Sequence, residues 1–146
     1  MKKLFLMLSF AGAALFAVAQ DAPAAAPDPN AADFKWESTT IDYGTVNKGD
    51  EGSATRYFKF TNVGKSPLII SSCRGSCGCT VPQCPTEPIP PGKGGEIKVH
   101  YDVNRVGPFT KTVTVTSNAK NPNETLKIQG TVNDTTPAEA PAEKKN

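Results

Sequence analysis

The residues of this chain with the most chemical potential are four cysteines, which all lie within twelve consecutive positions: Cys73, Cys77, Cys79 and Cys84. Thiols at this spacing support three kinds of chemistry. They can pair as disulfides, bind a soft metal ion as thiolates, or exchange electrons with another thiol. Any chemistry in this chain is therefore expected in the segment that carries them.

Disulfide bonding is the favoured hypothesis, because an even number of cysteines permits complete pairing and a small domain gains stability from a cross-link. A Cys73–Cys84 bond would close a loop of about a dozen residues and stabilise the fold by roughly 3 kcal/mol. A Cys77–Cys79 bond would need Gly78 to fold the chain back, since the Cβ atoms of an extended strand are too far apart. Four cysteines allow three pairings, and the spacing does not select one.

The alternatives use the same residues as thiols. In an extended segment Cys77 and Cys79 point the same way, so they could bind Cu(I) or Zn, with Cys73 and Cys84 completing the site. A redox role is the other alternative, because a Cys-x-Cys disulfide is strained and Arg74 could lower the pKa of a neighbouring thiol.

No other residues form a recognisable catalytic group, and the chain is not expected to be an enzyme. His100 is the only histidine, and the surrounding alternation places it on the solvent face of a strand. Trp36 is expected in the core or at a sheet edge. With one histidine and no Gly-x-Ser-x-Gly turn, a serine hydrolase has no support. Apart from the metal alternative, no cofactor is expected.

The elements that position the cysteines are predicted to be strands. Apolar and polar residues alternate with a period of two, and turn residues interrupt the pattern every dozen or so positions. Nowhere does the apolar spacing of a helix appear. The pattern predicts an all-β, immunoglobulin-like sandwich of about seven to eight antiparallel strands. The alternating segments are residues 34–43, 56–62, 68–71, 97–101, 109–115 and 126–132.

The two ends of the chain are predicted to lie outside this fold. Residues 1–19 have two lysines, an apolar run shorter than the roughly 20 residues that span a bilayer, and Ala-Val-Ala before Gln20, which is typical of a secretory signal peptide. Residues 20–32 and 133–146 are poor in large apolar side chains and are predicted to be disordered. The folded domain is therefore expected at residues 33–132.

Charge argues against two classes of partner. Loss of Lys2 and Lys3 with the leader would leave fourteen basic and fourteen acidic residues, so the processed chain is formally neutral. A neutral chain has no electrostatic attraction for nucleic acid or for an anionic membrane. Neither is expected as a partner, and no membrane insertion is expected after signal cleavage.

Several motifs resemble one known family. Residues 58–70 (FKFTNVGKSPLII), residues 76–82 (SCGCTVP) and residues 87–99 (EPIPPGKGGEIKV) are similar to the bacterial domain of unknown function (DUF) 1573 family, as are residues 41–46 and 126–132. That family looks like an exported relative of the Hydin-type, ASH-like immunoglobulin-like domains. The resemblance implies a fold and a location rather than a reaction.

The family motif corresponds here to Ser76, Cys77, Gly78, Cys79 and Thr80, whereas Cys73 and Cys84 are additions to it. The leading hypothesis is an exported, periplasmic or secreted, non-enzymatic interaction module with a disulfide-stapled loop and a protein or peptide partner in the cell envelope. The alternative is a metal-binding or thiol-redox protein that uses the Cys-Gly-Cys segment.

Overall fold

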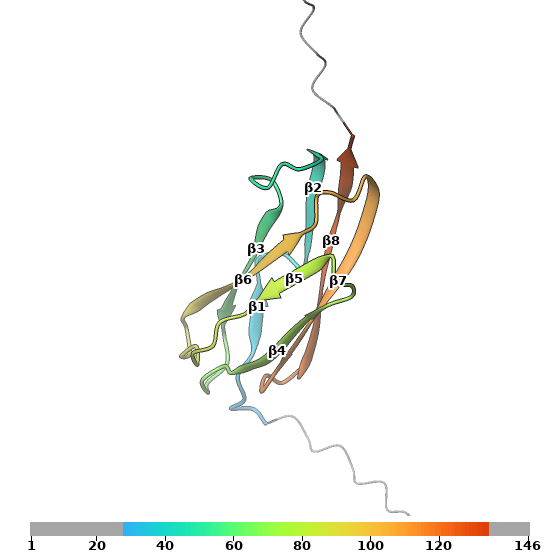
Figure 1. Ribbon diagram of the computed structural model, residues 1–146. Coiled ribbons are helices and arrows are strands. Elements are labelled where there is room, and N and C mark those ends of the chain that lie inside the picture. The colour runs from blue at the N-terminus through green and yellow to red at the C-terminus, as the bar shows by residue number, and fades with distance from the viewer. Residues whose placement is uncertain (1–27, 135–146) are drawn as a thin grey trace, which may run out of the picture.

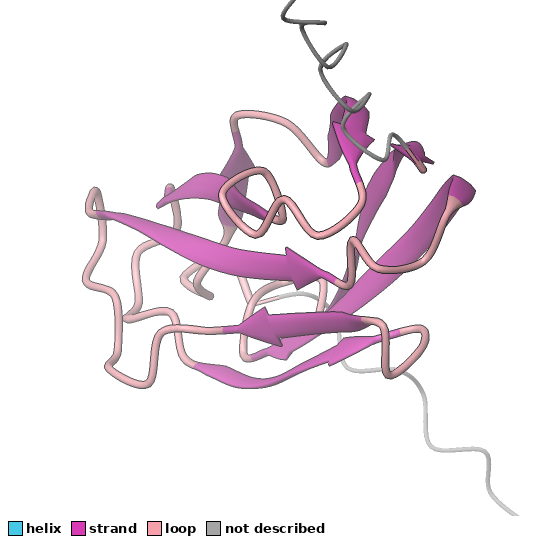
Figure 2. Cartoon of the chain, turned by 45° about the horizontal axis from the view of Figure 1, so that its top comes forward, coloured by secondary structure: helices cyan, strands magenta, loops and turns pink. Residues whose placement is uncertain are grey.

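The computed structural model describes residues 28–134, and within this range it contains strands, turns and bends but no helix (Figure 2). Among these residues there is accordingly no apolar helix of membrane-spanning length. The part of the chain that is described contains eight strands: β1 (Phe34–Trp36), β2 (Thr40–Asn47), β3 (Thr55–Asn62), β4 (Ile70–Gly75), β5 (Thr80–Gln83), β6 (Gly94–Tyr101), β7 (Gly107–Ser117) and β8 (Asn123–Asn133).

The strands form two four-stranded sheets that pack face to face. One sheet has the order β1-β3-β6-β5 and the other β2-β8-β7-β4. In Figure 1 β4 and β5 lie next to each other along one side of the molecule, although they belong to different sheets. The predicted all-β sandwich is confirmed.

The core lies between the sheets and includes alternate apolar side chains of the predicted strand segments. Phe58 and Phe60 on β3 are 1% and 2% exposed, while Lys59 between them is exposed. Burial also raises the pKa of Tyr43 to about 12, against a smaller opposing effect of the Arg56 charge. The phenol therefore stays neutral and donates a hydrogen bond of 3.1 Å to the Val99 carbonyl.

Two details of strand arrangement differ from the prediction. Residues 34–43 form two strands rather than one, because the chain leaves the first sheet after Trp36 and enters the second at Thr40. In addition, β2 pairs with β8 in parallel, whereas the other pairs are antiparallel. Alternation reports which face a side chain occupies, and it carries no information on strand direction or sheet membership.

The ordered region begins before the predicted boundary at residue 33. Ala32 is fully buried and forms an isolated bridge with Ala119, and the Asp33 carboxylate lies 3.4 Å from the Lys120 ammonium. Residues 28–32 were assigned to the disordered linker because they lack large apolar side chains. Alanine is small enough to enter a tight contact between backbones, which a criterion based on large side chains misses. The predicted leader, the rest of the linker and residues 135–146 of the predicted tail lie outside the described residues, whereas Asn133, also assigned to that tail, is the last residue of β8.

Candidate functional site

The four cysteines form a structure that we call the cysteine clasp, residues 73–84, at the side of the sandwich where β4 and β5 meet. Cys73 lies on β4, at the edge of one sheet, and Cys84 follows β5, at the edge of the other. A disulfide joins them, with their Cα atoms 6.2 Å apart. This bond therefore links the two sheets covalently, and all four cysteines of the described region are in disulfides.

The prediction that the cysteine segment is a loop was wrong in part. Cys73 is inside β4, opposite Val115 of β7, and residues 80–83 form β5, which pairs with β6. Pro82 lies within β5, where its missing N–H is tolerated because the strand has a neighbour on one side only. Proline and the closely spaced cysteines concealed this strand in the sequence.

Within the clasp the two strands approach each other closely at Gly75. A Cβ atom placed on Gly75 would overlap the carbonyl oxygen of Thr80, a backbone atom that cannot rotate away. Gly78, by contrast, has open space around its Cα and a φ angle outside the left-handed region. The glycine that the clasp requires is thus Gly75 and not the glycine between the two cysteines.

We expect Gly75→Ala to destabilise the protein by about 1–3 kcal/mol or more, because the methyl group forces β4 and β5 apart. Gly78→Ala is the matched control and should change stability by less than about 0.5 kcal/mol. Urea unfolding of the two oxidised variants, followed by circular dichroism, measures both values. Equal stability of the two variants would show that β4 and β5 are not held this closely in solution.

The tip of the clasp is a tight turn closed by the second disulfide. Cys77 and Cys79 are bonded, with Cα atoms 5.2 Å apart, and the amide of Thr80 donates a 3.2 Å hydrogen bond to the Cys77 carbonyl. As predicted, this pairing requires the chain to fold back at Gly78. The fold-back uses an ordinary turn hydrogen bond rather than a left-handed glycine.

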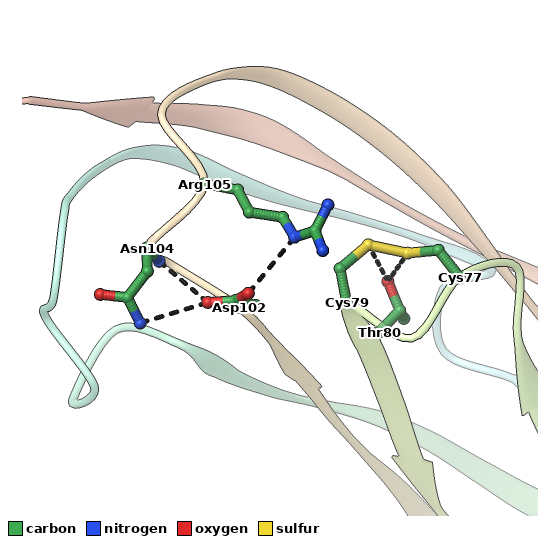
Figure 3. Close-up of polar contacts among 6 residues, drawn as sticks. All are labelled: Cys77, Cys79, Thr80, Asp102, Asn104 and Arg105. Atoms are coloured by element: carbon green, nitrogen blue, oxygen red, sulfur yellow. Dashed lines mark hydrogen bonds and ion pairs between the residues drawn. A yellow bond between two sulfur atoms is a disulfide. The ribbon is translucent and has the colours of Figure 1, made fainter.

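Polar groups surround this second disulfide (Figure 3). The Thr80 hydroxyl is buried and lies 3.6 Å from Cys77 Sγ and 3.8 Å from Cys79 Sγ. On the other side, the Asp102 amide donates a 2.9 Å hydrogen bond to the Cys79 carbonyl. Arg105 Nε lies 3.3 Å from Asp102 Oδ2, and its guanidinium extends toward the disulfide in Figure 3.

The Asp102 carboxylate is held ionised by its own loop. Hydrogen bonds from the backbone amide and side chain of Asn104 lower its pKa, and Arg105 lowers it further. The Asp102–Arg105 pair therefore orients a guanidinium toward the Cys77–Cys79 disulfide, as Figure 3 shows. Sequence reasoning missed this arginine, because it follows Cys79 by 26 positions and only the pairing of β5 with β6 brings the two segments together.

Arg74, the cation that the sequence suggested for a redox site, does not face the disulfides. It is exposed on β4 opposite Thr114, whereas Cys73 and Gly75 on either side of it face inward. Its guanidinium therefore belongs to the outer face of its sheet. The metal alternative meets a separate obstacle: with both disulfides formed the sulfurs are not thiolates. No group of three or more metal-ligating side chains is found within residues 28–134.

A second surface is notable for exposed apolar side chains. Tyr57 and Val81 are 46% and 49% exposed, and both lie on the outer face of the β1-β3-β6-β5 sheet. Tyr57 is opposite Lys98 of β6, and Val81 is opposite His100 of the same strand. As predicted, His100 faces outward, where its Nε2 is 3.6 Å from the Glu51 carboxylate.

Comparison with solved structures identifies the fold. A protein of unknown function from Porphyromonas gingivalis W83 is 17% identical with a TM-score of 0.59, over 68% of this chain and 46% of that one. The ASH/PapD-like domain 7 of human CEP192 is 9% identical with a TM-score of 0.58, over 80% and 96%. One chain of the CsuC–CsuE chaperone–tip adhesion subunit complex from Acinetobacter baumannii is 11% identical with a TM-score of 0.50, over 68% and 56%.

This chain therefore spans about half the length of the P. gingivalis protein. At these sequence identities, the structural similarity establishes a PapD-like, immunoglobulin-like fold but no function. No curated protein matches the sequence. The model of the family described as "Protein of unknown function (DUF1573)" matches residues 34–132, which is the whole sandwich from the start of β1 to the end of the core. The resemblance seen in the cysteine motif and the glycine-rich turns is thus confirmed, and the chain belongs to the DUF1573 family.

Proposed function

We propose that this chain is an exported, non-enzymatic module that binds a protein or peptide partner in the cell envelope. The observation that carries the proposal is the paired exposure of Tyr57 and Val81 on one regular sheet face. Tyrosine is enriched in protein interfaces because its ring contributes a large contact area and its hydroxyl keeps a polar partner. Lys98 and His100 between them supply the polar groups that give a contact its orientation.

The strand edges are less suited to this role than the face. The edge of β2 has a register shift between Asp42 and Thr45, where Gly44 adopts a φ of 65°, and such bulges interrupt pairing with an added strand. Pro82 removes a donor from β5, and the clasp ties the β5 edge to β4. The edges of β2, β4 and β5 are therefore interrupted or tied by the clasp, and the fourth edge strand, β1, has only three residues. For this reason we assign recognition to the sheet face.

Export is supported by the two disulfides, which persist in oxidising compartments and are rare in the cytoplasm. The leader predicted at residues 1–19 is the corresponding sequence signal. We expect the exported protein to begin at Gln20, as N-terminal sequencing of material from the envelope or medium would show. Retention of Met1 on protein that carries both disulfides would contradict processing at this position.

The binding surface is tested by Tyr57→Ser combined with Val81→Ser. Removing two exposed apolar groups from a contact should weaken capture of the partner by about tenfold or more, without a change in melting temperature beyond a few degrees. The measurement is quantitative mass spectrometry of proteins retained from envelope extract by the immobilised oxidised chain.

The matched control is Val63→Ser combined with Val106→Ser. These valines are equally exposed, at 52% and 51%, but they lie outside the strands. This control should retain the same proteins as the unmodified chain. If both double variants lose the same proteins, the contact is non-specific and the proposed face is wrong.

A further inference from the structure

We propose that the Cys77–Cys79 disulfide is a reversible thiol–disulfide exchange site, and that its reaction partner is a protein or peptide dithiol. This proposal is independent of the binding face. The two disulfides of the clasp differ in what they hold. Cys73–Cys84 joins two sheets, whereas Cys77–Cys79 closes a turn whose two ends are already fastened by other bonds.

Those other bonds hold the turn on both sides. Before it, the Ser76 amide donates a 2.9 Å hydrogen bond to the Thr112 carbonyl, and the Thr112 amide donates a 3.2 Å hydrogen bond to the Ser76 hydroxyl. After it, the Cys79 carbonyl accepts a 2.9 Å hydrogen bond from the Asp102 amide. Reduction of Cys77–Cys79 therefore leaves two thiols facing each other on a fixed backbone, which is the condition for ready re-formation of the bond.

Exposure assigns a different role to each sulfur. Cys77 is partly exposed, while Cys79 is 3% exposed. An incoming thiolate can therefore reach Cys77 Sγ, and Cys79 is the leaving sulfur. When the bond breaks, the Cys79 sulfur becomes a thiolate. The Thr80 hydroxyl lies 3.8 Å from this sulfur, and the Arg105 guanidinium extends toward the disulfide (Figure 3). A hydrogen-bond donor and a cation both stabilise a thiolate.

The reaction balances with the dithiol as the reductant. One partner thiolate attacks Cys77 Sγ, the Cys77–Cys79 bond breaks, and Cys79 Sγ takes up the electron pair and then a proton. The second partner thiolate attacks the sulfur bound to Cys77, which releases the Cys77 thiolate and closes a disulfide in the partner. The chain gains two electrons and two protons, and the partner loses them. The reverse sequence oxidises a dithiol partner.

The first experiment treats the oxidised full chain with dithiothreitol under native conditions, followed by iodoacetamide and peptide mass mapping. We expect the Cys77–Cys79 bond to be reduced, and its partly exposed thiol Cys77 to be alkylated, roughly ten times faster than Cys73 and Cys84. Circular dichroism of the same samples should remain that of the folded sandwich. Reduction of Cys73–Cys84 at the same rate, or of Cys77–Cys79 only after unfolding, would overturn the proposal.

The assignment of roles is tested with single variants and oxidised glutathione. Cys79→Ser should acquire glutathione on Cys77, while Cys77→Ser should modify Cys79 about ten times more slowly because Cys79 is buried. Equal rates in the two variants would overturn the assignment.

Substitutions of Thr80 distinguish a chemical role of its hydroxyl in the reduction of Cys77–Cys79 from a purely structural role of its side chain. Thr80→Val keeps the shape but removes the hydroxyl, and it should slow reduction of Cys77–Cys79 by about tenfold, the effect of one hydrogen bond. Thr80→Ser keeps the hydroxyl and should restore the rate. A slow rate in both variants would mean that packing, and not the hydroxyl, is responsible, which contradicts the proposed stabilisation of the leaving thiolate.

Discussion

Replacing Phe58 by alanine is expected to lower the free energy of unfolding by about 3–5 kcal/mol. The ring is 1% exposed and lies on β3, opposite Ile97 of β6, in the centre of the space between the sheets. Removing it takes away the transfer free energy of a large apolar group and leaves a cavity that the flanking strands cannot close, since each is fixed by its ladder of hydrogen bonds. Urea unfolding monitored by circular dichroism gives the value.

Lys59→Ala is the control for this prediction. Lys59 is the next residue of the same strand and faces solvent, so its loss should cost less than about 0.5 kcal/mol. Similar losses at both positions would mean that β3 does not present the face shown by the structure. The comparison tests the register of the whole strand, because a shift by one residue would exchange the two side chains between core and solvent.

Removing the Cys73–Cys84 disulfide with a Cys73→Ala, Cys84→Ala double variant is expected to cost roughly 3 kcal/mol. In the chain-entropy account the bond limits the unfolded chain over a loop of about a dozen residues. In the folded protein the same bond ties β4 to the segment after β5, and so joins the free edges of two sheets. The free energy of unfolding should be measured without reductant, so that Cys77–Cys79 stays oxidised.

A second double variant, Cys77→Ala with Cys79→Ala, separates the two bonds. It should cost about half as much, roughly 1.5 kcal/mol, because the bond restricts only three residues of the unfolded chain and the turn keeps the hydrogen bonds that flank it. A loss as large as that of the first variant would show that the tip of the clasp is part of the stability of the fold. In that case opening of Cys77–Cys79 would destabilise the sandwich itself, and the exchange site would lose its basis.

Together these expected effects give the two disulfides of the clasp different roles. The inter-sheet bond, with Gly75 beneath it, holds β4 against β5. The turn bond lies at the tip of the clasp and joins a partly exposed Cys77 to a buried Cys79. If the contact of β4 with β5 does not depend on the turn bond, the proposed change in the oxidation state of Cys77 and Cys79 leaves the proposed binding face around Tyr57 and Val81 formed.

Much of this architecture was predictable from the order of residues alone. Alternation in residues 56–62 and 97–101 indicates one shared face for Phe58 and Phe60 and one for Ile97 and Val99, because a side chain two positions along a strand returns to the same face. His100 was placed on the solvent face for the same reason, and the closeness of the cysteines in sequence made disulfides between them feasible at any backbone geometry that folds back. These conclusions depend on local spacing, which a chain carries whatever its tertiary structure.

Other features of the structure depend on contacts between segments that are distant in sequence. The parallel pairing of β2 with β8, the entry of residues 34–36 and 40–47 into different sheets, and the burial of Ala32 against Ala119 depend on sheet order, which alternation does not encode. The same holds for the cation that we propose assists exchange at Cys77–Cys79. Arg74 is close to the cysteines in sequence but occupies the outer face of its sheet, while Arg105 arrives through the pairing of β5 with β6. Local spacing decides which face a side chain takes. Only the pairing of strands and the packing of the two sheets decide which side chains from distant strands share a site.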